Sequence, residues 1–189
     1  MTTILGISGS LRSGSFNTML LKQAVRAAPE GVRVELGSIK DIPLYNGDLE
    51  IASGLPAAAQ QLKTQAIQCD GLLLVTPEYN NGIPGVFKNA IDWLTRPAAD
   101  VPRVFGNKPV AVIGASPGNF GTLLAQEAWL PVLRILGTRP FFGARIMVSR
   151  AASVFDDAGE IKDDALLAQL RKFMSGFTGF VQANTSPGR

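Results

Sequence analysis

The sequence contains no histidine, and Cys69 is its only cysteine. A catalytic triad with histidine, a Cys-His pair and a zinc site of histidine and cysteine ligands are therefore excluded. An intrachain disulfide is excluded as well, because it needs two thiols. We expect Cys69 to be structural or incidental. One cysteine and the absence of a signal peptide together predict a cytoplasmic protein.

Charge of one sign and long hydrophobic runs are also scarce. The 18 Lys and Arg residues and 15 Asp and Glu residues give a net charge of +3, and the basic residues are scattered singly. This distribution offers no basic stripe to a nucleic acid. The longest apolar runs, such as Gly71 to Val75, are far shorter than the ~20 residues that cross a membrane. We expect neither kind of partner.

What the sequence does contain is an alternation of short β-branched apolar runs with longer helical patterns, which is typical of parallel β-α units. Its 189 residues fit one domain, expected over residues 1–184 with a frayed tail at 185–189. The fold class is therefore α/β. We expect strands at Ile4–Ser8, Val32–Leu36, Gly71–Thr76, Pro109–Ala115 and Ala144–Ser149. We expect helices at Phe16–Ala28, Pro56–Gln68, Gly85–Thr95, Gly121–Leu136 and Asp163–Ala183.

Two of these helices differ in how much apolar surface they must bury. The last one carries a single apolar stripe, which one face of a sheet can cover. The helix at Gly121–Leu136 is apolar on nearly all sides, and a bend is expected at Pro131. On a monomer its outer side would be a large exposed patch, so we predict an interface in a homo-oligomer. Burial under loops of the same chain is the alternative.

The loop after the first strand is rich in glycine and hydroxyl side chains and leads into a helix. Free backbone N–H groups and the helix dipole make such a place an anion site. The glycine spacing does not match a dinucleotide fingerprint, and Ser15 stands where the phosphate loop of ATPases needs lysine. We expect a phosphate monoester, bound without a metal by Ser10, Ser15, Asn17 and the Arg12 guanidinium. Alternatively, Ser15 only caps the helix and Arg12 is solvated.

The loop after the third strand reads Thr76-Pro77-Glu78-Tyr79-Asn80-Asn81-Gly82-Ile83-Pro84-Gly85. In an open parallel sheet of order 2-1-3-4-5, ligands bind at the carboxyl ends of the first and third strands, where both loops lie. The second loop suits a flat heterocycle, because backbone N–H groups of Glu78, Tyr79 and Asn80 can face ring acceptors while the tyrosine shields one side. The alternatives are that the loop is a plain turn and that Trp93 belongs to the core.

Together with the Gly114–Gly118 turn, these loops resemble the NADPH-dependent FMN reductase family of flavodoxin-like proteins, and within it the bacterial NAD(P)H quinone and chromate reductases. The resemblance extends over essentially the whole chain. It implies a flavodoxin-like three-layer sandwich with a five-stranded parallel sheet of order 2-1-3-4-5, and a homodimer or homotetramer. It also implies an FMN site made by Ser10, Leu11, Arg12, Ser15, Phe16, Asn17, Pro77, Glu78, Tyr79, Asn80 and Ser116.

By this resemblance the FMN phosphate would be held by Ser10, Arg12, Ser15, Phe16 and Asn17. Residues Pro77 to Asn80 would line the flavin ring, and Ser116 would contact the ring or its ribityl chain. Family members often have Ser or Tyr after the Pro-Glu-Tyr-Asn loop, whereas this chain has Asn81-Gly82. The difference lies on the expected substrate face of the flavin.

The function that follows is an FMN-dependent oxidoreductase. We expect NAD(P)H to deliver hydride to FMN and leave, after which a small-molecule acceptor binds by ping-pong exchange. Quinones, chromate, azo compounds, ferric complexes and free flavin are candidate acceptors. The flavin carries the chemistry, so neither a catalytic side chain nor a metal is expected. One alternative is a flavodoxin-type electron carrier, although carriers tend to be strongly acidic and this chain is not. Another is a phosphate-binding regulatory module without flavin.

Overall fold

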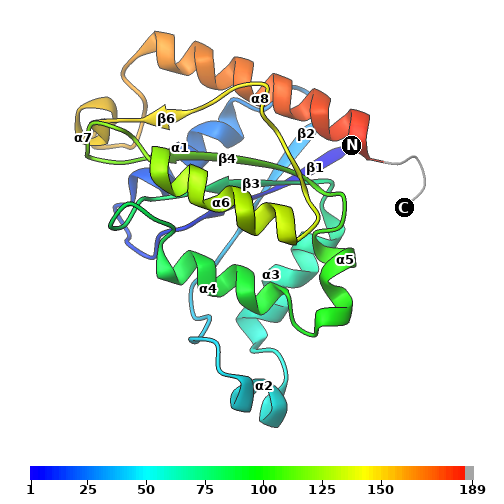
Figure 1. Cartoon of the computed structure of the whole chain (residues 1–189). Helices are drawn as coiled ribbons and strands as arrows, with labels where there is room; N and C mark the ends of the chain where they lie inside the picture. The colour runs from blue at the N-terminus through cyan, green and yellow to red at the C-terminus, as the bar shows by residue number, and fades with distance from the viewer. Residues whose placement is uncertain (186–189) are drawn as a thin grey trace.

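A parallel sheet forms the centre of the computed structural model, which describes residues 1–185. Within that range the strand order is β2-β1-β3-β4-β5, with β6 also paired to β4, so the predicted order is confirmed. Helices cover both faces of the sheet (Figure 1). The strands are β1 (Thr2–Ser8), β2 (Val32–Gly37), β3 (Gly71–Val75), β4 (Pro109–Ala115), β5 (Arg139–Pro140) and β6 (Met147–Val148).

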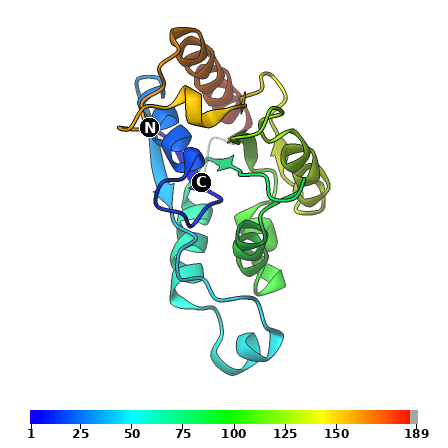
Figure 2. The ribbon, with the colours of Figure 1, turned by 90° about the vertical axis from the view of Figure 1, so that its left-hand side faces the viewer.

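The two faces of the sheet carry separate apolar clusters. Side chains of α1 (Phe16–Arg26) and α8 (Asp164–Asn184) pack on one face, and those of α3 (Ala57–Gln68), α4 (Gly85–Leu94) and α6 (Leu123–Ile135) pack on the other. Figure 2 shows these layers from one side. Every residue of β3 is buried, as its uninterrupted apolar run predicts for a strand covered on both faces. The predicted helices are all present, with ends shifted by up to two residues.

The fifth strand differs from the prediction. Instead of one strand at Ala144–Ser149, two short strands pair with the two ends of β4: Arg139 with Pro109 at its start, and Met147 with Gly114 at its end. The intervening segment leaves the sheet because the Phe141 ring turns toward α8, where it packs against the rings of Phe173, Phe177 and Phe180. An apolar anchor therefore outcompetes a continuous hydrogen-bond ladder at this edge.

The prediction missed the short helices α2 (Gly47–Ser53), α5 (Val101–Val104), α7 (Ala151–Val154) and the 3-10 turn η1 (Ala98–Asp100). The α2 segment projects from the body of the molecule (Figures 1 and 2), and none of its residues is buried. Its base is held by Trp93, whose Nε1 donates to the Pro43 carbonyl at 2.8 Å. Trp93 is fully buried, so it belongs to the core.

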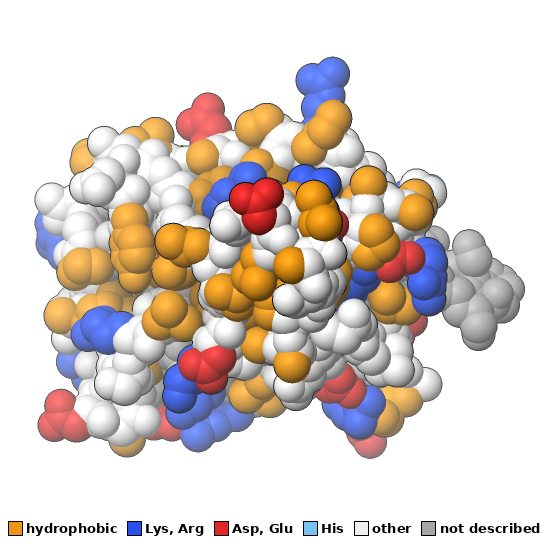
Figure 3. Space-filling view, turned by 90° about the horizontal axis from the view of Figure 1, so that it is seen from below, with side chains coloured by type: hydrophobic (Ala, Val, Ile, Leu, Met, Phe, Trp, Pro, Cys, Tyr) orange, Lys and Arg blue, Asp and Glu red, His pale blue; other side chains and the backbone are white. Residues whose placement is uncertain are grey.

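The outer side of α6 is exposed, as the prediction of an interface requires. Only Ala125, Trp129 and Leu133 of this helix are buried, whereas Ile135 retains 83% exposure. Loops of the same chain therefore leave much of its apolar surface uncovered. Seen from below, other exposed hydrophobic side chains lie among acidic and basic ones (Figure 3).

Helix α8 ends at Asn184, and Thr185 is the last residue that the structure describes. Thr185 still bonds to α8, since its N–H and Oγ1 both donate to the Val181 carbonyl. The rest of the predicted frayed tail, residues 186–189, lies outside the described residues. No helix within residues 1–185 combines the length and hydropathy needed to cross a bilayer.

Candidate functional site

A cavity of about 420 Å³ opens at the carboxyl edge of the sheet, between the loops that follow β1, β3 and β4. It brings together nine of the eleven residues expected at the flavin site. Leu11 and Asn80 are not part of its wall; Leu11 instead faces a neighbouring groove on the β2 side of the same loop. The wall consists of Ser10, Arg12, Ser15, Phe16, Asn17, Pro77, Glu78, Tyr79, Ala115, Ser116 and Pro117.

The amino end of α1 faces this cavity. Ser15 is the N-cap residue, and its Oγ accepts from the N–H groups of Asn17 and Thr18 at 3.2 and 3.4 Å. The helix has no acidic residue in its first turn, so its positive end is not neutralised from within. Capping and anion binding are therefore compatible here: the cap fixes the start of the helix while the dipole points at the cavity.

Asn17 joins α1 to the end of β4. Its Nδ2 donates to the Ala115 carbonyl and its Oδ1 accepts from the Ala115 N–H, both at 2.8 Å. The side chain is almost fully buried. Sequence reasoning assigned this amide to an anion alone, whereas its first task is to hold two walls of the cavity together. One Nδ2 hydrogen remains for an anion.

Arg12 lies at the mouth of the cavity. Its guanidinium lies 5.4 Å from the centre of the Phe16 ring, which in turn stacks on Phe155 at 5.9 Å. Among the residues that the structure describes, Arg12 forms no ion pair with an acidic side chain. A guanidinium supported on an aromatic ring and lacking a carboxylate partner can bind an incoming anion.

The loop after β3 contains a tight two-residue turn. Tyr79 and Gly82 exchange two backbone hydrogen bonds of 3.2 and 3.1 Å. Asn80 and Asn81 between them have φ values of 50° and 62°, the left-handed pair of a type I′ turn, which asparagine tolerates better than most residues. The Tyr79 N–H is thus used by the turn, which corrects the expectation that it faces a ligand. The N–H groups of Glu78 and Asn80 have no acceptor within residues 1–185.

Glu78 points its carboxylate at α6. Its Oε2 accepts from the Ala125 N–H at 2.9 Å, a contact that joins positions 47 residues apart in the chain. Sequence reasoning placed this residue in the ring-binding loop but missed the direction of its side chain. The only available signal was a helix start at Thr122 with no acidic residue in its first turn.

The remaining wall is formed by the turn after β4. The Ser116 N–H donates to the Val148 carbonyl at 2.9 Å, and the Ser116 carbonyl accepts from the Ala151 N–H at 3.0 Å. Arg150 adopts a left-handed φ of 48° and its Nε donates to the Asn119 Oδ1. Sequence reasoning placed Val148 and Ser149 at the end of the fifth strand but missed that residues 148–151 bond to the Ser116 turn, because nothing in their pattern indicates these contacts.

Two glycines allow the loops to approach this closely. A Cβ on Gly9 would lie 2.2 Å from the Phe87 ring, and a Cβ on Gly114 would lie 2.1 Å from the Thr122 Oγ1. Any side chain at these positions would push the β1 loop off α4 or the β4 turn off α6. Within residues 1–185 there is no cluster of acidic and cysteine side chains able to hold a metal.

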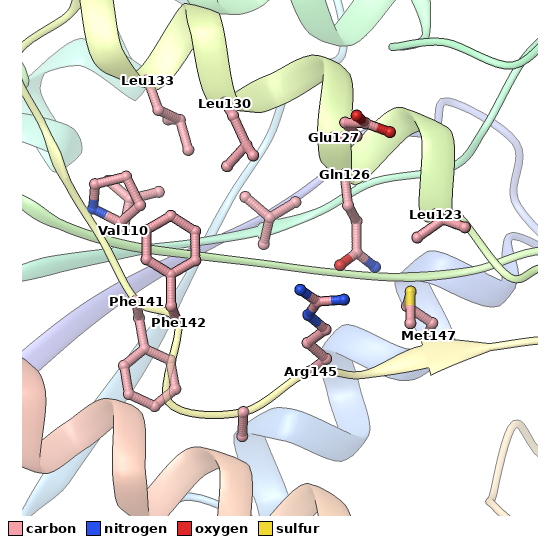
Figure 4. A pocket seen from close by; sticks show the side chains of 13 residues that line it. Val110, Leu123, Gln126, Glu127, Leu130, Leu133, Phe141, Phe142, Arg145 and Met147 are labelled. Atoms are coloured by element: carbon pink, nitrogen blue, oxygen red, sulfur yellow. The ribbon is translucent and has the colours of Figure 1, made fainter.

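A second cavity, of about 270 Å³, lies between α6 and the segment that joins β5 to β6 (Figure 4). It is mostly apolar, and Figure 4 shows the Arg145 side chain pointing toward Gln126 across it. None of its residues lines the cavity at the carboxyl edge. It therefore belongs to the exposed surface of α6.

Comparison with known proteins gives the family. The model of the family described as NADPH-dependent FMN reductase matches residues 2–153. An NAD(P)H-dependent FMN reductase of Pseudomonas aeruginosa is 45% identical over 161 residues, 85% of each chain. A quinone reductase of Escherichia coli is 36% identical over 184 residues, 95% of each chain.

A solved structure agrees with these sequence matches. The flavoenzyme NAD(P)H:(acceptor) oxidoreductase from Paracoccus denitrificans superposes with a TM-score of 0.87 at 33% identity, covering 97% of this chain and 99% of its own. Similarity of this extent includes all three loops around the cavity. The chain belongs to the NADPH-dependent FMN reductase family and is a flavodoxin-like oxidoreductase.

Proposed function

We propose that the cavity at the carboxyl edge binds FMN and that the chain passes reducing equivalents from NAD(P)H through it to quinones or similar acceptors. The observation that carries this proposal is that one cavity combines two features. Arg12 and the amino end of α1 suit a phosphate, and the loop that carries Tyr79 suits a flat ring. The residues fit the group at both ends. The membership of the family, and the names of its relatives, support the same cofactor and co-substrate.

At the phosphate end, the donors exceed what a structural loop needs. Ser10, Arg12 and the amino end of α1 form one part of the wall, and Glu78, the one acidic residue among the described lining, bonds to the Ala125 N–H of α6. The helix dipole contributes about 0.3–1 kcal/mol, whereas each charge-assisted hydrogen bond contributes about 1.5–3 kcal/mol. Micromolar binding needs about 8 kcal/mol, so several such bonds must act together. Arg12 and the hydroxyl side chains can supply them.

At the ring end, the Glu78 and Asn80 N–H groups and the half-exposed Tyr79 ring offer donors and a flat apolar surface. When bound, FMN supplies the hydride chemistry itself. In this proposal the chain's own residues hold one face of the ring, and the other face is left as room for a second planar molecule. NAD(P)H and the acceptor would use that room in turn, which is the basis for ping-pong exchange.

The first test compares flavin binding in the wild type with a double variant, Arg12→Ala plus Ser15→Ala. We expect the purified wild type to bind FMN and to oxidise NAD(P)H with a quinone, and the double variant to lose both. Arg171→Ala plus Ser175→Ala, on the exposed side of α8, is the matched control. Full retention of flavin by the Arg12/Ser15 variant would refute the phosphate assignment.

The second test identifies the electron donor and acceptor. Steady-state oxidation of NADH and of NADPH is measured with a quinone, chromate, an azo dye, a ferric complex and free flavin. A flavodoxin-type carrier would bind FMN yet fail to oxidise either nucleotide without a partner reductase. A colourless protein that ignores FMN would instead indicate a phosphate-binding module. Parallel initial-rate lines over a range of both substrates are expected for ping-pong exchange.

We also propose that α6 forms an interface between copies of this chain. Leu130 is 40% exposed on α6 and Phe142 is 72% exposed beside it, across the apolar cavity of Figure 4. At the rim, Glu127 and Arg145 have no ion-pair partner within residues 1–185, and a two-fold interface that sets Glu127 of one copy opposite Arg145 of the other would pair both charges twice. A reducing, cytoplasmic location remains the prediction made from the single cysteine.

Sedimentation tests this interface. The wild type is expected to sediment as a dimer or tetramer at micromolar concentration, and Leu130→Glu is expected to shift it toward monomer. Leu36→Glu, at an exposed position on β2, is the control. A wild type that sediments as a monomer at this concentration would contradict the proposal.

A further inference from the structure

Helix α6 begins without a cap of its own. Thr122 is its N-cap residue, but it forms no side-chain capping bond; its Oγ1 instead accepts from the Gln126 side chain at 3.0 Å. The first turn carries no acidic residue. An uncapped helix leaves N–H groups unsatisfied and a positive end uncompensated. One of the free N–H groups and the positive helix end are compensated by a residue far away in the sequence.

The Glu78 carboxylate provides the missing cap. Its Oε2 accepts from the N–H of Ala125, the third residue of the helix, at 2.9 Å. A carboxylate at this end is doubly favourable, because it accepts a hydrogen bond and opposes the positive end of the dipole. A cap normally comes from the residue just before the helix, whereas this one comes from the loop after β3.

The same bond restrains the ring-binding loop. The turn between Tyr79 and Gly82 is closed on itself, and the Thr76 hydroxyl bonds only to the neighbouring Pro77 carbonyl. Within residues 1–185, the Glu78 to Ala125 bond is the one hydrogen bond that ties Pro77–Gly82 to another element. The position of Tyr79 and of the two free N–H groups therefore depends on where α6 begins.

We propose that Glu78 is a positioning residue for the flavin. Its hydrogen bond to the start of α6 holds the ring-binding loop in the conformation that accepts the cofactor. The loop and the first turn of the helix therefore become ordered together. The inference rests on the proposed flavin site. A ligand that orders the loop must by reciprocity strengthen the contact with α6, because both events act on one equilibrium.

Three variants separate this role from simple helix capping. Glu78→Ala removes the acceptor, Glu78→Gln retains an oxygen that can accept the same N–H, and Asp163→Ala removes the carboxylate cap of a different helix, α8, as a control. We expect FMN affinity to fall about tenfold in Glu78→Ala, as the loss of one hydrogen bond that holds the loop predicts, and to stay within threefold of wild type in the other two.

The rise in thermal midpoint that FMN produces is the readout that a purely structural cap would not move. A cap that serves only the helix would lower the midpoints of the apo and FMN-loaded forms equally and leave FMN affinity unchanged, and that result would overturn the inference. A positioning residue instead reduces the rise in midpoint that FMN produces. Glu78→Gln should restore that rise.

Amide hydrogen exchange in the wild type supplies a test that needs no variant. FMN is expected to slow exchange at the Ala125 N–H, although the flavin itself is held by other elements. Unchanged exchange at this amide on FMN binding would overturn the inference. Failure of the proposed function gives a different result. Wild-type protein that binds no FMN would contradict both proposals. A Glu78→Ala variant with wild-type FMN affinity would contradict only this one.

Discussion

Two polar clusters lie at opposite edges of the same sheet and differ in whether their donors have acceptors within the protein. At the amino edge, Lys108 is 2% exposed, and its ammonium donates to the carbonyls of Ala66 and Cys69, the second at 3.0 Å. At the carboxyl edge, Arg12 and the N–H groups of Glu78 and Asn80 have no such internal acceptors. A buried charge satisfied by its own fold is structural, whereas donors without an internal acceptor are available to a ligand.

Cys69 belongs to the structural cluster. Its Sγ lies 3.8 Å from the Lys108 Nζ and donates weakly to the Ala66 carbonyl. Burial raises the pKa of this thiol, and the nearby ammonium of Lys108 opposes that rise only in part. A neutral, enclosed thiol is a poor nucleophile, which agrees with the reading of Cys69 as structural or incidental.

The largest expected effect comes from Lys108→Ala. It removes the ammonium donor from the Cys69 carbonyl and leaves the Ala66 carbonyl with only the weak Cys69 thiol donor, and each buried group left unsatisfied costs about 1–3 kcal/mol. We expect the free energy of unfolding, measured with urea, to fall by about 3 kcal/mol or more. FMN affinity of the folded protein should not change. Lys172→Ala, at an exposed position on α8, is the control, and a comparable loss of flavin binding in Lys108→Ala would erase the contrast between the edges.

Asn17→Asp, unlike Lys108→Ala, should affect FMN affinity more than the free energy of unfolding. The carboxylate can still accept the Ala115 N–H, but it cannot donate to the Ala115 carbonyl and it adds a negative charge beside the expected phosphate. We expect FMN affinity to fall more than tenfold, while the unfolding free energy of the apo protein falls by only about 1–3 kcal/mol. Titration of flavin fluorescence measures the first and urea the second. Unchanged FMN affinity would show that no phosphate lies near this side chain.

A smaller, pH-dependent effect is expected at the Lys63–Asp100 ion pair, whose nitrogen and oxygen lie 2.6 Å apart. The hydrogen bond from Lys63 lowers the pKa of Asp100 below its ordinary value of 3.8. The stabilisation is therefore complete above that value and is lost as pH falls through the lower, folded-state pKa. The difference in urea midpoint between wild type and Asp100→Asn should stay constant from pH 7 to 5 and shrink below about pH 4. A constant difference throughout would exclude this pairing.

Cys69 should show the smallest effect. Because the thiol is buried and protonated, we expect no alkylation by iodoacetamide at pH 8 until the protein is unfolded. Cys69→Ala should leave turnover with NAD(P)H and a quinone within twofold of wild type. Rapid labelling of the native protein, or a loss of turnover larger than this, would move Cys69 from the structural cluster to the functional one.

Periodicity and strand direction carried most of what could be predicted. Parallel strands place all their carboxyl ends at one edge, so Ser10 to Asn17 and Pro77 to Asn80 had to converge once the strand order was correct. The split of the fifth strand could not be foreseen, because it depends on the Phe141 ring finding three aromatic partners on α8. The orientation of Glu78 also depends on tertiary contact, since its acceptor role is defined by a helix 47 residues away.

The α2 segment has a consequence for how the molecule opens. None of its residues is buried, and its base is fixed by Trp93 and by Asn89, whose side chain bonds to the Pro43 carbonyl at 2.9 Å and to the Tyr45 N–H at 2.8 Å. Melting α2 therefore exposes almost no core, while the anchor below it stays in place. We therefore expect this segment to open locally at low energy, so that proteases cut it without unfolding the sheet.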